Sequence, residues 1–202
     1  MSETTLVHMA TMTVFERLVE RAADQHGFIR AAQAQELSID PAVLRQLAAI
    51  GRLEHRGWGL YRLVAIPITE QDEFHEAVLW ANGRGVIAGE SALALWNLAD
   101  VNPMKIEIIV PPTYQPRRQG RDRYITRRRK LKVTDIDTVN NIPVLTPQVA
   151  IADAIKVGIA DGLVTQAIVN ARARELIGSV TEARLRVQLA DRGISKKSLS
   201  ND

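Results

Sequence analysis

Residues 40–51 read DPAVLRQLAAIG, and this stretch decides the fold of the N-terminal part of the chain. Asp40 can accept hydrogen bonds from the free N–H groups of a first helical turn, and Pro41 suits the first helical position. The leucines and alanines that follow are spaced to form one apolar face, which ends at the closing glycine. Arg45 and Gln46 lie off that face. We therefore predict a helix that begins at Asp40 and directs these two polar side chains toward solvent.

The flanking sequence completes a winged helix-turn-helix. Upstream, apolar residues recur every three or four positions over residues 12–27, and a shorter helix is expected over residues 31–37. Downstream, residues 52–56 and 60–64 have the composition of strands and are joined by the tight turn Gly57-Trp58-Gly59. Three helices followed by a hairpin are typical of a winged helix.

A winged helix places its third helix in the major groove and its hairpin beside the DNA backbone or minor groove. Arg45 and Gln46 suit the edges of guanine and adenine, respectively. We expect phosphate contacts from four basic residues in and near the hairpin: Arg52, His55, Arg56 and Arg62. Trp58 is either a wedge near the DNA or a turn residue packed on Tyr61. Because residues 1–68 contain seven basic and seven acidic residues, a protein-interaction module is the alternative.

The rest of the chain predicts a second domain of mixed α and β structure. Strands are expected at residues 106–110 and 142–145, with further strands flanking the arginine-rich segment. The expected helices cover residues 71–80, 90–98, 147–156, 160–173 and 181–192. The fold class is therefore α+β, with an N-terminal winged helix-turn-helix (residues 12–66) followed by a mixed α/β C-terminal domain (residues 70–195).

Nearly all of the positive excess lies in one segment. Residues 105–132 contain ten basic and two acidic residues, a net charge of +8, whereas the whole chain has a net charge of +3. Three interpretations stay open: a second contact with nucleic acid, a face that meets an acidic or nucleotide-binding protein partner, or a solvated loop. The first would make binding fall roughly a thousandfold between low and moderate salt. This second basic patch consists of Arg117, Arg118, Arg121, Arg123, Arg127, Arg128, Arg129 and Lys130.

The sequence argues against catalysis. All four histidines precede Ser91, so the faint nucleophile elbow around this serine lacks its downstream base. Asp135 and Asp137 form a pair that we interpret as solvated or capping carboxylates, and Asp153 lies inside an apolar helix, where a hydrogen-bonded core acid is expected. We expect no enzymatic activity, no cofactor and no metal. The chain has no cysteine, no secretory signal and no membrane-spanning run, so we expect a cytoplasmic protein.

Several stretches resemble a known family. They are residues 27–34 (GFIRAAQA), LRQL at residues 44–47, GRL at residues 51–53, GLYR at residues 59–62, HEA at residues 75–77, GESALAL at residues 89–95, the strand at residues 106–110 followed by Pro111, IPVLTP at residues 142–147 and IAD at residues 151–153. Their order over residues 13–192 resembles AbiEi-family antitoxins. The chain departs from the common pattern at Trp96-Asn97-Leu98, where a His-Gly-Leu-like stretch is more usual.

The resemblance implies an antitoxin of a bacterial toxin–antitoxin system. Such a protein neutralises a nucleotidyltransferase-like toxin, directly or indirectly, and represses its own operon by binding repeats in double-stranded promoter DNA. Because palindromic sites mirror two-fold symmetry, we expect dimerisation on the DNA. Two alternatives are a stand-alone winged-helix regulator without a toxin and a DNA-targeted nuclease.

Overall fold

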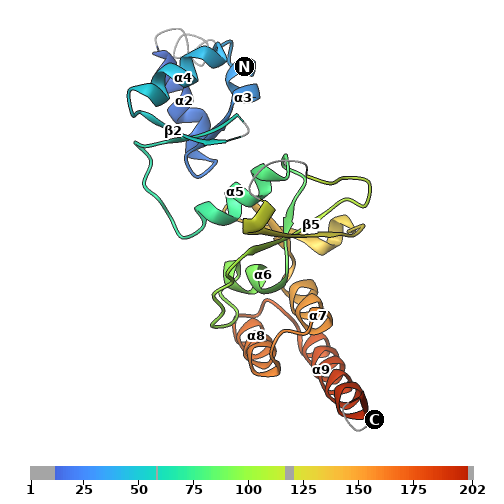
Figure 1. The fold of residues 1–202 in the computed structure, drawn as a ribbon. Coiled ribbons are helices and arrows are strands. Elements are labelled where there is room, and N and C mark those ends of the chain that lie inside the picture. Colours follow the sequence, from blue (N-terminus) through green and yellow to red (C-terminus); the bar gives the residue numbers. More distant parts are fainter. Residues whose placement is uncertain (1–11, 58, 117–120, 200–202) are drawn as a thin grey trace. The chain divides into compact units, whose positions relative to one another are not determined.

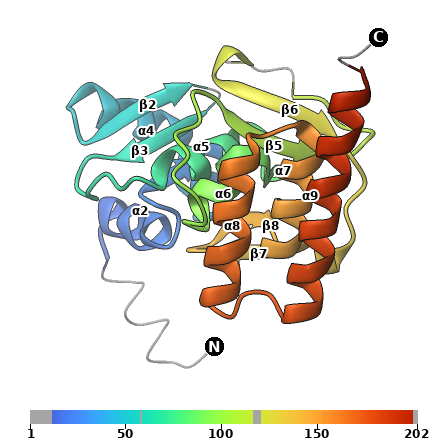
Figure 2. The same ribbon diagram turned by 90° about the horizontal axis from the view of Figure 1, so that it is seen from below.

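Two units make up the chain, Met1–Glu76 and Ala77–Asp202. The computed structural model describes residues 12–57, 59–116 and 121–199, and for residues 121 and 194–199 it describes the backbone alone. Both units are drawn in Figures 1 and 2. The division falls inside helix α5 (Asp72–Trp80), so the first turns of this helix belong to the N-terminal unit.

The N-terminal unit has the order of a winged helix. Its elements are α2 (Val14–Ala23), β1 (Phe28–Arg30), α3 (Ala31–Glu36), α4 (Pro41–Ala49), β2 (Leu53–Gly57) and β3 (Leu60–Leu63). Thr13 caps α2 in a capping box, because its hydroxyl accepts the N–H of Glu16 and the Glu16 carboxylate accepts the N–H of Thr13. The expected three helices and hairpin are confirmed.

One strand of this unit has no clear signal in the sequence. The three residues of β1 pair antiparallel with β3, so the sheet has the order β1-β3-β2 and β3 is its central strand. The core beneath it consists of Leu18, Ala22, Ile29, Ala34, Ile39, Leu44, Leu53, Tyr61 and Leu63. Residues on both faces of β3 are buried.

The C-terminal unit is built on a mixed five-stranded sheet. The strands are β4 (Val86–Ile87), β5 (Ile106–Val110), β6 (Tyr124–Arg128), β7 (Ile136–Val139) and β8 (Ile142–Leu145), in the order β6-β5-β4-β8-β7. β5 pairs with β6 and β4 with β8 in parallel, whereas the β4–β5 and β7–β8 pairs are antiparallel. The expected strands at residues 106–110 and 142–145 are confirmed. Strand β6 runs through the arginine segment itself, rather than beside it.

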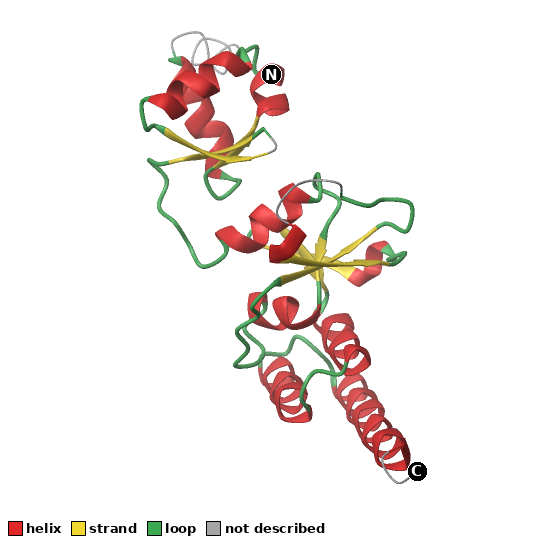
Figure 3. Cartoon of the chain, viewed as in Figure 1, coloured by secondary structure: helices red, strands yellow, loops and turns green. Residues whose placement is uncertain are grey.

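Helices cover both faces of this sheet (Figures 1 and 3). On one face, Trp80 of α5 packs on Tyr124 of β6 with ring centroids 4.7 Å apart. The other face is covered by α6 (Gly89–Leu95) and α7 (Pro147–Val157), and α8 (Asp161–Ala173) and α9 (Ser179–Leu199) pack on α7. Two short 3₁₀ turns, η1 (Arg121–Arg123) and η2 (Val133–Asp135), precede β6 and β7. The α+β class is therefore confirmed.

The departure at Trp96-Asn97-Leu98 has a local explanation. Asn97 adopts a left-handed backbone with φ of 52°, a conformation that Gly adopts freely and Asn tolerates better than most residues. Trp96 donates its indole N–H to the carbonyl oxygen of Leu145 at 2.8 Å. These residues therefore form the turn after α6 and tie it to the end of β8.

Candidate nucleic-acid interface

Helix α4 presents two adjacent polar side chains on a firmly held rod. The carboxylate of Asp40 accepts the N–H of Ala42 at 2.7 Å, and Pro41 occupies the first turn. Leu44 has no exposed surface and belongs to the core of the unit. Arg45 and Gln46 are exposed, as the helical period requires of residues that follow a buried one. The arrangement matches a reading helix whose donors and acceptors can reach base edges.

Two of the predicted phosphate contacts lie close to this helix in the chain. The N–H of Arg52 donates to the carbonyl oxygen of Leu47 at 2.9 Å, so the residue is tied to the last turn of α4. Its guanidinium lies 4.9 Å from the ring centroid of Phe15, a cation–π contact that leaves the charge exposed. His55 is exposed on β2 and packs its ring against Tyr61 at 4.9 Å. Both residues are accessible to a phosphate.

Arg62 is the clear correction. It was expected to contact phosphate, but it is only 4% exposed. Its Nε donates to Asp72 Oδ2 at 3.1 Å, and its Nη2 donates to the carbonyl oxygen of Ile66 at 2.8 Å. Both partners belong to the segment that runs from β3 into α5, so this segment lies against the face of β3 that carries Arg62. Arg62 therefore holds this segment to the sheet and is unavailable to DNA.

Arg56 holds an intermediate position. Its side chain is partly exposed, and Nη2 donates to Glu76 Oε2 at 2.8 Å, with Glu54 also near. Glu76 is buried, so the contact ties the wing to the first turns of α5, which belong to the same unit. The sequence did contain a signal for these partners: Asp72 and Glu76 are four residues apart and therefore share one face of the helix. A phosphate would have to compete with Glu76 for Arg56.

A histidine pair is buried beside these ion pairs. His75 is buried against Phe28 and His26, with ring centroids 5.8 Å and 4.9 Å away. Neither ring nitrogen of His75 has a hydrogen-bond partner among the described residues. Burial, reinforced by His26 and opposed by Asp72, lowers the pKa of His75 from 6.5 to about 4. The folded unit therefore holds a neutral imidazole at this position.

The second basic patch does not form one surface. Arg117 and Arg118 lie outside the described residues, as does the side chain of Arg121 and the predicted wedge Trp58. Arg123 lies over the ring of Tyr124 at 5.3 Å. Alternation along β6 and the residues after it sends Arg127 and Arg129 toward α7 and Arg128 to the opposite face.

Arg127 and Arg129 grip one buried acid. Nη1 of each donates to Asp153 Oδ1, at 3.0 Å for Arg127 and 2.7 Å for Arg129. Arg127 Nη2 also lies 3.4 Å from Glu107 Oε2. Asp153 is 2% exposed and further accepts the N–H of Gly89 at 3.3 Å. Asp153 therefore holds both arginines, which argues against Arg127 as part of a free contact surface, whereas Arg129 stays partly exposed. The expectation that Asp153 is a hydrogen-bonded core acid is confirmed.

The two acids around Arg127 shift in opposite directions. Burial raises the pKa of Asp153, but the hydrogen bonds and charges of Arg127 and Arg129 outweigh it and bring the pKa below its ordinary value. Burial raises the pKa of Glu107 above its usual range, although the N–H of Glu90 and the charge of Arg127 oppose the rise. Arg127 therefore stabilises the charge of Asp153 more than that of Glu107. Beside them Ser91, fully buried, accepts the N–H of Glu107 at 2.9 Å, which is a packing role.

The remaining candidates are local in character. Asp135 accepts the N–H of Lys132 at 2.9 Å, and Asp137 accepts the N–H of Thr138 at 2.8 Å. No group of three or more His, Asp or Glu residues in the described part of the chain is arranged to hold a metal ion. Over the same residues, no helix combines the length and apolar character needed to cross a bilayer.

Comparisons with known proteins agree with this geometry. A family model described as a transcriptional regulator, AbiEi antitoxin, matches residues 16–64, and a model of the AbiEi antitoxin C-terminal domain matches residues 84–199. A crystal structure of the RV2827C protein from Mycobacterium tuberculosis is similar over 89% of this chain and 81% of that chain, with 18% identity and a TM-score of 0.46. No curated protein matches the chain.

Proposed function

The chain belongs to the AbiEi antitoxin family, and on that premise we propose that it represses its own operon through α4 and counters a nucleotidyltransferase-like toxin. The family assigns the roles of antitoxin and DNA-binding regulator. Our proposal adds which DNA it binds, its own promoter, and which kind of toxin it counters. A regulator of this kind acts in the cytoplasm, where the promoter is, and performs no reaction of its own.

The exposed pair Arg45 and Gln46 is the observation that supports promoter recognition best. Both side chains project from a helix that is fixed at its start by Asp40 and along its length by buried Leu44. A rigid helix keeps its polar groups at constant spacing, which direct recognition of bases in the major groove requires. Arg45 can donate two hydrogen bonds to guanine, and Gln46 can exchange two with adenine.

Phosphate contacts in the proposal come from the residues that remain accessible. Arg52 and His55 are exposed near α4 and on the wing, whereas Arg62 is buried. Because the N-terminal unit has few free cations, we expect a modest salt dependence and a larger share of specificity from base contacts. Two copies bound to inverted repeats would double the contact area and match the symmetry of the site.

The test is gel retardation of the chain's own promoter fragment. Arg45→Ala should weaken binding by about 2 kcal/mol and relax the preference for promoter over random duplex, because a contact that reads a base is lost. Arg186→Ala is the matched control: this arginine is exposed on α9 and paired with Glu182, so its loss removes a charge far along the chain. Equal weakening of promoter and random DNA by Arg45→Ala would contradict base reading.

The toxin half needs a separate measurement. Co-expression with the nucleotidyltransferase-like product of the adjacent open reading frame should restore growth that the latter arrests. Co-purification of the two proteins would indicate direct neutralisation, and rescue without it would indicate an indirect route. Growth arrest that persists despite well-expressed, folded chain would contradict the antitoxin assignment and favour the stand-alone regulator.

A further inference from the structure

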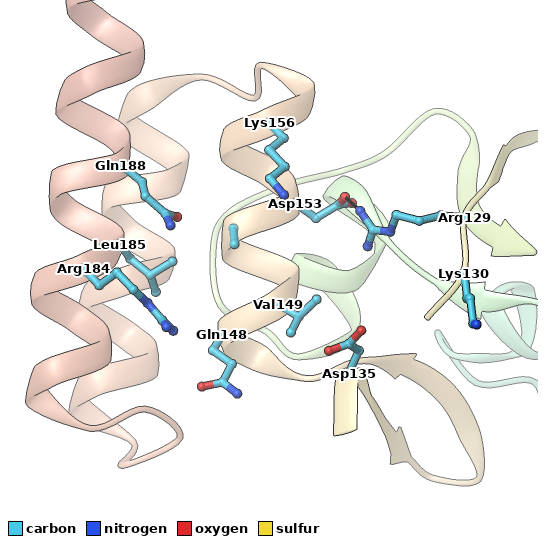
Figure 4. Close-up of a pocket in the computed structure, with 11 residues that line it drawn as sticks. Arg129, Lys130, Asp135, Gln148, Val149, Asp153, Lys156, Arg184, Leu185 and Gln188 are labelled. Carbon is cyan, nitrogen blue, oxygen red and sulfur yellow. Dashed lines mark hydrogen bonds and ion pairs between the residues drawn. The ribbon is translucent and has the colours of Figure 1, made fainter. Parts of the chain in front are cut away.

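A cavity of about 430 Å³ lies between α7, α9 and the segment that follows β6. Figure 4 shows Arg184 and Gln188 reaching toward it from α9, with Arg129 and Lys130 on the opposite side. Lys156 and Gln148 belong to α7, between these two walls. The volume lies within the range of about 300–1,000 Å³ that small-molecule sites occupy. All of its lining residues belong to the C-terminal unit.

Three cations of this cavity are unsatisfied. Among the described residues, Lys130, Lys156 and Arg184 have neither an ion pair nor a hydrogen bond through their side chains. Elsewhere on α9 the arginines do find carboxylates: Arg186 pairs with Glu182 at 2.8 Å, and Arg192 pairs with Asp161. Three elements therefore bring free positive charges to one hollow, and such charges favour an anionic ligand.

The acids of the cavity do not cancel this charge. Asp153 already accepts hydrogen bonds from both Arg127 and Arg129 and is almost fully buried. The same contact holds the partly exposed guanidinium of Arg129 in place at the wall. The other acid, Asp135, accepts a backbone N–H from Lys132 and keeps its charge, but four cations and only two carboxylates line the cavity. The site is therefore positive, and one of its cations is already oriented before a ligand arrives.

The start of α7 adds to the same field. Thr146 makes no side-chain capping bond, and Gln148 and Val149 of the first turn line the cavity. The free N–H groups of a first helical turn and the helix dipole both favour a negative charge. The amide side chains of Gln148 and Gln188 supply neutral donors around it.

From these contacts we infer that the cavity binds a phosphate group, carried by a free nucleotide or by a strand of nucleic acid. A tetrahedral phosphate has oxygens that accept hydrogen bonds from several directions, as walls formed by α7, α9 and the segment after β6 require. A planar carboxylate is satisfied by a single guanidinium and would leave the remaining cations unpaired. A concave site of this size also suits a small group better than a flat protein surface does.

A neighbouring cleft suits the remainder of a nucleotide. It has a volume of about 220 Å³, shares Arg129 and Lys130 with the first cavity, and is lined largely by apolar side chains such as Val86, Pro111 and Pro112. At its edge Arg84 lies over the ring of Tyr114 at 4.8 Å. A ligand with phosphate at one end and a flat base at the other would use both cavities. A nucleotide should therefore bind more tightly than pyrophosphate.

Calorimetric titration of the full chain at low salt tests this inference. The probes are adenosine and guanosine mono- and triphosphates, pyrophosphate, a short single-stranded oligothymidylate and a tetraglutamate peptide. We expect saturable binding of a phosphate-bearing probe and at least a roughly tenfold loss in the double variant Lys156→Gln/Arg184→Gln. Arg186→Gln, on the same helix, is the control and should bind like the parent chain. Both replaced residues are exposed, so the urea midpoint should stay unchanged.

Each outcome decides the inference. Nucleotide binding lost in the double variant supports a free nucleotide, and oligothymidylate binding alone, lost in the same variant, supports a nucleic-acid strand. Absence of saturable binding by all phosphate-bearing probes would overturn the site, as would equal affinity in the double variant. Tighter binding of tetraglutamate than of any phosphate probe would also overturn it, because the cavity would then prefer carboxylates. None of these results depends on whether α4 binds the promoter.

Discussion

Two regions of this chain use their arginines in opposite ways. Residues 1–68 have no net charge, yet α4 and the segment that follows it expose Arg45 and Arg52. The segment from Arg117 to Lys130 has a large positive excess, yet Arg127 and Arg129, in its second half, bind buried Asp153. The comparison teaches that a charge count predicts a local field but not which charges are free. Availability depends on the partner that the fold supplies.

The largest effect is expected from a substitution that breaks the ion pair between Arg127 and Asp153 in the second region. Arg127→Ala leaves buried Asp153 with Arg129 as its remaining cationic partner and removes the cation near Glu107. We expect a loss of about 4 kcal/mol in the free energy of unfolding, because a buried carboxylate is left undercompensated. Urea denaturation followed by circular dichroism measures it. Arg128→Ala is the matched control, since its side chain is exposed on the other face of β6 and should cost less than about 0.5 kcal/mol. Similar losses of stability in the two variants would show that Arg127 is a solvated surface residue, as Arg128 is.

Acid should destabilise the N-terminal unit more than the C-terminal unit. The folded pKa of His75 is lowered from 6.5 to about 4, so the unfolded chain binds more protons between these pH values. The contribution of neutral His75 to the free energy of unfolding is therefore full above about pH 6.5. It declines by about 3 kcal/mol in all as the pH falls to about 4. Asp153 has a lowered pKa, so its contribution is kept above the ordinary aspartate pKa of about 3.9 and is lost only at lower pH.

Urea titrations followed by amide NMR signals of each unit, at pH 7 and pH 5, measure this difference. The urea midpoint reported by signals of the N-terminal unit should be lower at pH 5 than at pH 7. The midpoint reported by signals of the C-terminal unit should change less. His75→Leu is the control, because the ring makes no hydrogen bond with a described residue and its loss removes the titrating group. A parent chain whose N-terminal unit is as stable at pH 5 as at pH 7 would contradict the neutral buried imidazole.

The smallest expected effect sharpens the comparison on DNA. Arg52→Ala should weaken promoter binding by about 1 kcal/mol and reduce the slope of log affinity against log salt by about 0.9, because one phosphate contact is lost. Arg128→Ala should leave both quantities unchanged if the winged helix alone contacts the promoter. A lower salt slope for Arg128→Ala would instead show that the exposed part of the second basic region also contacts the DNA.

Local signals accounted for most elements and for part of the site. The cap and proline before α4, the turn between β2 and β3, and the apolar runs of β5 and β8 all act within a few residues, so the sequence predicts them well. Strand β1 was missed because its three residues are stabilised by pairing with β3 rather than by any pattern of their own. Strand β6 was obscured because its arginines resemble a solvated run until Asp153 is placed beside them.

The sequence by itself determined the winged helix, the exposed face of α4 and the place of Asp153 in the core. Tertiary structure alone decided which arginines are free, because each assignment depends on a partner distant in the chain. Arg62 is buried and paired with Asp72, Arg127 is paired with Asp153, and Arg184 lines a cavity together with Lys156 and Lys130. Periodicity reports which side of an element faces the interior, whereas the pairing of charges depends on how separate elements pack, which local sequence does not encode.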